Sequence, residues 1–169
     1  MEQLLAAFPP NREIVSVNWD PVEEDLGLVV PGPCRALVET YGGARFDDFI
    51  SVLMPGAENE NLDLVSRTKK IWWALDESDD EDDAEFLQEH GLSIRDLVAW
   101  GVTGNGDFCF AVNPSKVSEV TIVCDPRESD WESFRVTPDD FLGQILEGDL
   151  ACSVFPGSFP SGAPTFYYL

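Results

Sequence analysis

The sequence predicts an α+β fold, with a mostly antiparallel sheet of about four to six strands and helices packed on one face. Helical patterns come first, a series of strand patterns follows, and one helical pattern closes the order, as in folds of this class. The 169 residues are 44% hydrophobic and 11% aromatic, which is enough for the core of one domain. We expect a single domain over 1–169, with its core at about 17–148.

The first predicted helix begins at Asp20, which can cap it, and Pro21 takes the favoured first position. Glu23 is placed to reach back to the amide of the cap, and Gly27 ends the helix. A second helix is expected from Cys34 to about Thr40, because its apolar residues recur at helical spacing.

The next elements alternate between strand and helix. Gly42 and Gly43 supply a left-handed stop for the second helix. Residues 46–54 are expected to form one strand, which Pro55 and Gly56 end. A third helix is predicted from Asn61 or Asp63 to about Leu75, and a short helix from Ala84 to His90.

The second half of the chain is predicted to be rich in strands. Residues 97–102 and 108–112 form a hairpin, because Asn105-Gly106 between them is a strong turn signal. Strands at 119–124 and 131–136 follow. A capping-box pattern at Thr137 then opens a last helix that ends at Gly148.

The tail at 151–169 is rich in proline, glycine and aromatic residues. It either wraps the body of the domain or is partly disordered.

The charge of the chain restricts its partners. Thirty-two acidic residues face 10 lysines and arginines, for a formal net charge of -22. Such a field repels nucleic acids and anionic membranes and attracts basic proteins. We therefore expect no direct nucleic-acid binding and no membrane partner. The charge is densest at 76–85, which is either a solvated loop or a docking surface for a cationic partner.

No motif indicates a catalytic residue, a metal or a cofactor. His90 is the only histidine, and no nucleophile motif accompanies it, so a role at a helix end is expected. Asp79, Glu81 and Asp83 alternate like the first ligands of a calcium loop, but Ala84 stands where that loop needs glycine. Four cysteines without C-x-x-C spacing are expected to be buried apolar residues: Cys34, Cys109, Cys124 and Cys152.

Cytoplasm is the expected location. The chain has no run of about 18 apolar residues that would span a membrane. Its first ten residues have no basic region and too short an apolar stretch for a signal peptide.

Three segments, in order, resemble the SUKH superfamily, whose namesakes are the yeast cell-wall assembly regulators. They are WDPVEEDLG at 19–27, LVETYGG at 37–43 and WGVTGNGD at 100–107. The strand and capped helix within 131–146 also fit the C-terminal end of that family. The residues that carry the signature are Trp19, Glu23, Gly27, Tyr41, Gly42, Trp100, Gly101, Gly106 and Asp107.

The resemblance implies an α+β fold and, in bacteria, an immunity protein that binds and neutralises a cognate polymorphic toxin, often a nuclease. An intracellular interaction scaffold, as the yeast namesakes suggest, is the alternative. The signature residues themselves have structural explanations. Trp19 and Trp100 are expected in the core, the glycines at turns, and Asp107 bonded to nearby amides.

The expected surface for a basic toxin is the acidic run with the aromatic residues beside it. Those aromatic residues also follow the spacing of a core-facing helical stripe, so both interpretations stay open. The candidate partner-binding residues are Asp79, Asp80, Glu81, Asp82, Asp83, Trp72 and Trp73.

Overall fold

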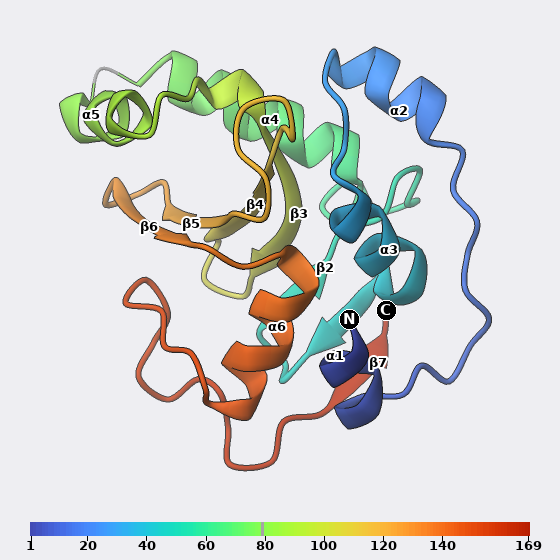
Figure 1. Ribbon diagram of the computed structural model, residues 1–169. Coiled ribbons are helices and arrows are strands. Elements are labelled where there is room, and N and C mark those ends of the chain that lie inside the picture. The colour runs from blue at the N-terminus through green and yellow to red at the C-terminus, as the bar shows by residue number, and fades with distance from the viewer. Residues whose placement is uncertain (79) are drawn as a thin grey trace.

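The fold is organised around one seven-stranded sheet in the order β6-β5-β4-β3-β2-β1-β7, with every neighbouring pair antiparallel (Figure 1). The computed structural model describes residues 1–78 and 80–169. The strands are β1 Ala44–Phe46, β2 Ile50–Val52, β3 Leu97–Thr103, β4 Phe108–Val112, β5 Thr121–Asp125, β6 Asp130–Phe134 and β7 Phe166–Tyr168. The antiparallel α+β class is therefore confirmed, with one strand more than the expected maximum.

The helices cover both faces of the sheet, whereas we expected them on one face. On β6, Trp131 stacks on Phe86 of α5, and Phe134 packs against Phe141 of α6. Because residues three apart in a strand point to opposite faces, α5 and α6 lie on opposite sides. The helices are α1 Glu2–Ala7, α2 Trp19–Leu26, α3 Gly32–Tyr41, α4 Leu64–Asp76, α5 Glu81–Glu89 and α6 Pro138–Glu147, with a 3-10 turn at Ile94–Asp96.

The cap of α2 differs from the expected one. The side chain of Asn18, and not that of Asp20, accepts from a backbone amide of the first turn. Glu23 reaches forward instead of back, where it accepts from the Val30 amide at 2.7 Å and pairs with Arg35. It therefore fixes the loop between α2 and α3.

The two glycines after α3 have different roles. Gly43 takes the left-handed conformation, with φ of +76°. Gly42 does not, but a Cβ there would lie 2.5 Å from the Val38 carbonyl oxygen. Gly42 is therefore needed for close approach of the chain, and Gly43 for the turn.

The single strand expected at 46–54 is wrong, because the chain turns back inside it. Asp47 and Asp48 both have positive φ and separate β1 from β2. Aspartate tolerates this left-handed conformation better than most residues. The apolar pattern runs through both strands and hides the turn.

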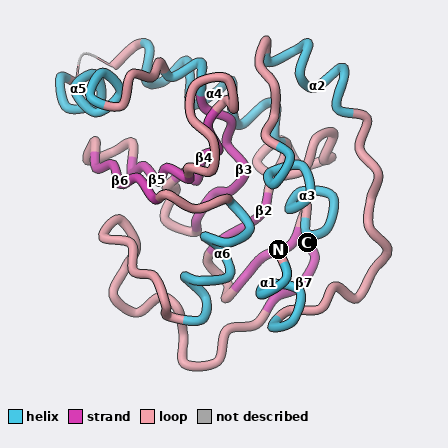
Figure 2. The backbone as a smooth tube through the Cα atoms, in the orientation of Figure 1, coloured by secondary structure: helices cyan, strands magenta, loops and turns pink. Residues whose placement is uncertain are grey.

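The C-terminal tail is ordered and joins the sheet through β7, which pairs with β1. Figure 2 shows the long loop that carries the chain from α6 to this strand. Phe166 stacks on Phe46 with ring centroids 5.3 Å apart, and Phe8, which follows α1, packs edge-on against both. The two ends of the chain thus close the same part of the core.

The acidic run is only partly a loop. Asp80 caps α5, which begins at Glu81, three residues before the expected start. Asp79 lies outside the described residues. At α6, Thr137 precedes the helix as expected, but its side chain makes no capping hydrogen bond. The predicted capping box is therefore not formed.

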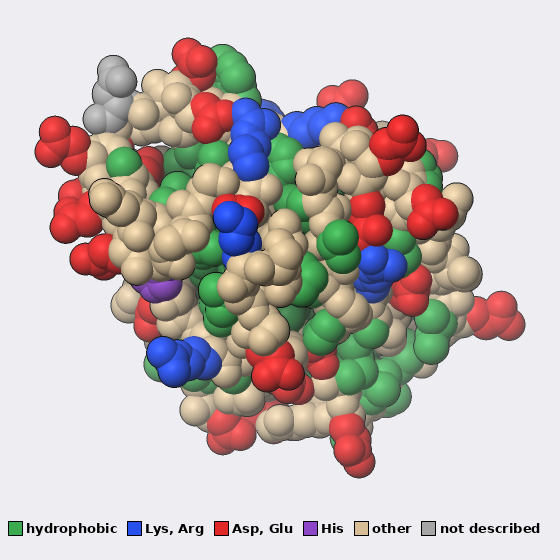
Figure 3. Space-filling view, turned by 45° about the horizontal axis from the view of Figure 1, so that its top comes forward, with side chains coloured by type: hydrophobic (Ala, Val, Ile, Leu, Met, Phe, Trp, Pro, Cys, Tyr) green, Lys and Arg blue, Asp and Glu red, His purple; other side chains and the backbone are tan. Residues whose placement is uncertain are grey.

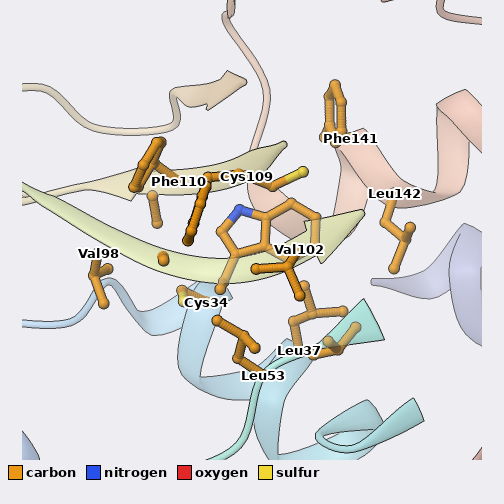
Figure 4. Close-up of a cluster of buried hydrophobic side chains, with 14 of the residues drawn as sticks. Cys34, Leu37, Leu53, Val98, Val102, Cys109, Phe110, Phe141 and Leu142 are labelled. Carbon is orange, nitrogen blue, oxygen red and sulfur yellow. The ribbon is translucent and has the colours of Figure 1, made fainter. Parts of the chain in front are cut away.

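Part of the core lies between the sheet and the helices α3 and α6 (Figure 4). Cys34 and Leu37 from α3, and Phe141 and Leu142 from α6, belong to it. Trp100 is fully buried there and meets Phe141 edge-on.

The remaining signature residues are structural. Trp19 is buried and donates to Glu39 at 2.8 Å, and the Tyr41 hydroxyl donates to the Phe8 carbonyl at 2.7 Å. Gly27 and Gly106 have positive φ. Gly101 lies inside β3, where the register with β4 shifts, and not in a turn.

Asp107 fixes the β3–β4 turn through side chains and not through amides. It accepts from the Thr103 hydroxyl at 2.6 Å and from Arg127 at 3.0 Å.

Candidate partner-binding surface

The acidic run supplies the N-terminal cap and the first turn of helix α5. The carboxylate of Asp80 accepts from the Asp82 amide at 3.0 Å, which satisfies a free donor of the first turn. Glu81, Asp82 and Asp83 fill that turn. Negative side chains at a helix N-terminus are stabilised by the helix dipole, so the run supports the helix that carries it.

Asp83 faces the sheet and not the solvent. Its side chain accepts from the Trp131 indole N–H at 2.7 Å, and the residue is only 5% exposed. Asp83 therefore anchors α5 to β6. It is not available for the expected contact with a partner.

Phe86 forms the second attachment of α5. Its ring lies between Trp131, at 4.9 Å between centroids, and His90, at 4.2 Å. His90 contacts the Phe86 carbonyl through Nδ1 at 2.9 Å and the Ser133 hydroxyl through Nε2 at 3.1 Å. The histidine thus caps the end of the helix, as its sequence context predicts.

A hollow of about 350 Å³ opens between α5 and the β5–β6 turn. We call it the acidic hollow, and its lining residues are Asp82, Glu85, Phe86, Glu89, Ser129, Asp130 and Trp131. Four carboxylates and two half-buried aromatic rings line it together. Within the described part of the chain, none of the four forms an ion pair.

This arrangement suits a cationic side chain. A lysine or arginine in the hollow would meet carboxylates around its charge and the exposed parts of Phe86 and Trp131 along its stem. In Figure 3 acidic side chains crowd the left edge of the molecule, where Figure 1 places α5. The hollow therefore lies within a wider negative surface, which attracts cations from a distance.

Only some of the residues predicted for this surface lie at or beside the acidic hollow. Asp82 lines the acidic hollow, and Asp80 and Glu81 are exposed beside it at the start of α5. Trp72 is buried, and its indole donates to the Leu97 carbonyl at 2.8 Å, so it belongs to the core. Trp73 is 66% exposed on α4 but does not line the hollow.

Sequence reasoning missed five lining residues, namely Glu85, Glu89, Ser129, Asp130 and Trp131. Glu85 and Glu89 follow Asp82 at helical spacing, which places all three on one helix face. A helix start at Glu81 would have revealed that face. Nothing local in the sequence indicates that Asp130 and Trp131 lie opposite it, because that contact joins α5 to a strand some 40 positions later.

The described residues contain no group of three His, Cys, Asp or Glu side chains placed to hold a metal ion. All four cysteines are buried, as predicted, and burial raises the thiol pKa of Cys34 and of Cys152 to about 12. No helix among these residues has the length and apolar character needed to cross a membrane.

The chain was also compared with known protein families, curated proteins and solved structures. No protein-family model matches the chain, and no curated protein or solved structure matches it either. The function is therefore argued from the surface itself.

Proposed function

We propose that this chain is a non-catalytic immunity protein that binds a cognate basic toxin through the acidic hollow and neutralises it. One observation carries the proposal: four carboxylates without ion-pair partners among the described residues line one hollow together with Phe86 and Trp131. The net charge of -22 and the resemblance to the SUKH superfamily agree with it.

The hollow has the two parts that a tight interface needs. Phe86 and Trp131 contribute aromatic surface to its lining, and four acidic side chains contribute negative charge. Central aromatic residues contribute most to the affinity of interfaces, whereas rim charges set the rate of encounter. A nuclease toxin carries a basic surface for phosphate, and an acidic inhibitor on that surface would exclude the nucleic acid.

The test is capture of the partner from a lysate of the native host, with two variants of equal net charge. The hollow variant carries Asp82→Asn, Glu85→Gln, Glu89→Gln and Asp130→Asn. The control variant neutralises four exposed acidic residues elsewhere: Glu2→Gln, Glu13→Gln, Asp20→Asn and Glu24→Gln.

We expect the parent and the control variant to retain one basic protein that the hollow variant loses. One equivalent of the parent should also abolish the toxic activity of that protein. A captured basic protein without toxic activity would instead indicate an interaction scaffold. Equal capture by both variants would show that the hollow is not the binding surface.

A further inference from the structure

A second pocket, of about 340 Å³, has the opposite chemical character. We call it the arginine pocket, and its lining residues are Arg45, Ser51, Asn59, Asn61, Leu62, Arg67, Val102, Thr103 and Leu169. None of these nine side chains is acidic, although the chain has 32 acidic residues and only 10 lysines and arginines. Two arginines thus line a pocket to which no acidic side chain contributes.

The sheet supplies the floor of the arginine pocket. Arg45 of β1 pairs with Ser51 of β2, Ser51 with Val102 of β3, and Val102 with Phe108 of β4. Cross-strand partners share one face of a sheet, so these side chains form a row. Arg67 of α4 lies over the Phe108 ring, 4.8 Å from its centroid. Arg45 therefore belongs to this row, and Arg67 packs on its Phe108 member.

The same row continues through Cys124 to Trp131 at the acidic hollow. The two pockets thus occupy opposite ends of one sheet face. Because none of the nine residues of the arginine pocket lines the acidic hollow, the two can be tested separately.

Neither arginine forms an ion pair within the described residues, although Arg45 hydrogen-bonds the Tyr167 side chain. In the described part of the chain, no ion pair joins the carboxylate of Leu169 to Arg45 or Arg67. The Nε atoms of both are buried and have no hydrogen-bond acceptor. Burial also lowers the pKa of Arg67. Buried donors without acceptors and a partly desolvated cation both favour an incoming oxyanion.

We propose that the arginine pocket binds a small molecule that carries a phosphate group. Two guanidinium groups match the charge of a phosphate monoester, which is about -1.5 to -2 near neutral pH, better than that of a single carboxylate. Asn59, Asn61 and Ser51 add polar groups that can contact the rest of the ligand. The volume lies in the range of small-molecule pockets. This site goes beyond the proposed toxin binding and does not depend on it.

The test is a titration of the folded chain with inorganic phosphate at constant ionic strength, followed through the backbone amide signals in NMR spectra. We expect saturable shifts at Ser51, Val102 and Thr103, and much weaker binding of acetate. Arg45→Gln and Arg67→Gln should each weaken phosphate binding at least tenfold. Arg135→Gln, an exposed arginine outside the pocket, should leave it unchanged.

One further variant protects the test against a loss of folding. The Asn59 side-chain oxygen accepts from the Asn61 amide at 3.0 Å. Asn59→Asp keeps that acceptor and adds a negative charge to the wall, so it should abolish phosphate binding in a folded chain. Three results would overturn the proposal: no saturable shift in the parent, unchanged binding in Asn59→Asp, or acetate bound as tightly as phosphate.

Discussion

The five tryptophans show how one residue type takes several roles in this chain. Trp100 is fully buried between the sheet and α6, whereas Trp73 is 66% exposed on α4. Both belong to apolar stretches of sequence, so composition alone does not separate them. The difference follows from which side of its element each side chain occupies.

Trp100→Ala should therefore unfold the protein more easily, without a selective effect on binding. Truncating a buried aromatic side chain costs about 3–5 kcal/mol of unfolding free energy. Trp73→Ala is the control, and we expect it to change this free energy by less than about 0.5 kcal/mol. Urea denaturation measures both. If Trp100→Ala unfolds like the parent but loses its partner, Trp100 is a contact residue and its place in the core is wrong.

Arg127 links stability to pH through two aspartates. Its hydrogen bond to Asp125 is the main cause of the lowered pKa of that carboxyl. Burial raises the pKa of Asp107, and Arg127 opposes that rise. Asp125 thus stabilises the fold above its ordinary pKa, and this contribution is lost as the pH falls through the lowered folded value. The contribution of Asp107 to stability depends on pH in the opposite sense. Its buried ionised form destabilises the fold, and protonation removes that destabilisation.

Arg127→Gln should consequently be most destabilising near neutral pH, well above the lowered pKa of Asp125. The difference in melting temperature between this variant and the parent should narrow as the pH falls below about 4, near the ordinary pKa of aspartate. Thermal unfolding at several pH values measures it, with the exposed Arg135→Gln as control. A gap that stays constant across this range would contradict the link.

At the scale of elements, local signals predicted most helices and strands, and tertiary contacts decided the rest. The hairpin from β3 to β4 and the helix from Leu64 follow from turn and capping residues. Strand β7 was not predicted, because its three residues are held by pairing with β1 and not by a pattern of their own. The start of α5 was missed because charge density was interpreted as a loop.

The attachment of α5 to the sheet rests on Asp83, and this can be tested directly. Asp83→Ala leaves the Trp131 indole N–H without its acceptor, which should lower the unfolding free energy by about 1–3 kcal/mol. The neighbouring Asp82→Ala removes an exposed carboxylate and should cost less than about 0.5 kcal/mol. Equal effects of the two substitutions in urea denaturation would show that Asp83 does not anchor the helix.

At the scale of the whole molecule, the order of the predicted elements indicated the fold class, and composition predicted the sign of the surface field. Neither predicted the acidic hollow or the arginine pocket. Both are assembled from segments far apart in sequence, as when Arg45 of β1 and Arg67 of α4 line one wall. Such sites depend on strand register, which a single sequence specifies only weakly.

The net charge also predicts how the fold responds to salt. The chain has 32 acidic residues and only 10 basic ones, so the excess negative charges repel one another in the compact state. Added salt screens that repulsion. The melting temperature should therefore rise between low and physiological salt. A scan of thermal unfolding in sodium chloride measures it, and an unchanged melting temperature would show that self-repulsion contributes little.

The most direct measurement of toxin capture is the association rate of the captured toxin with the parent, the hollow variant and the control variant at several salt concentrations. Long-range attraction acts on the encounter, so rim charges change association more than dissociation. We predict that the hollow variant associates about tenfold more slowly at low salt, or slower still, and depends less on salt than the control variant of equal net charge. Equal association rates for the two variants would contradict capture through the acidic hollow.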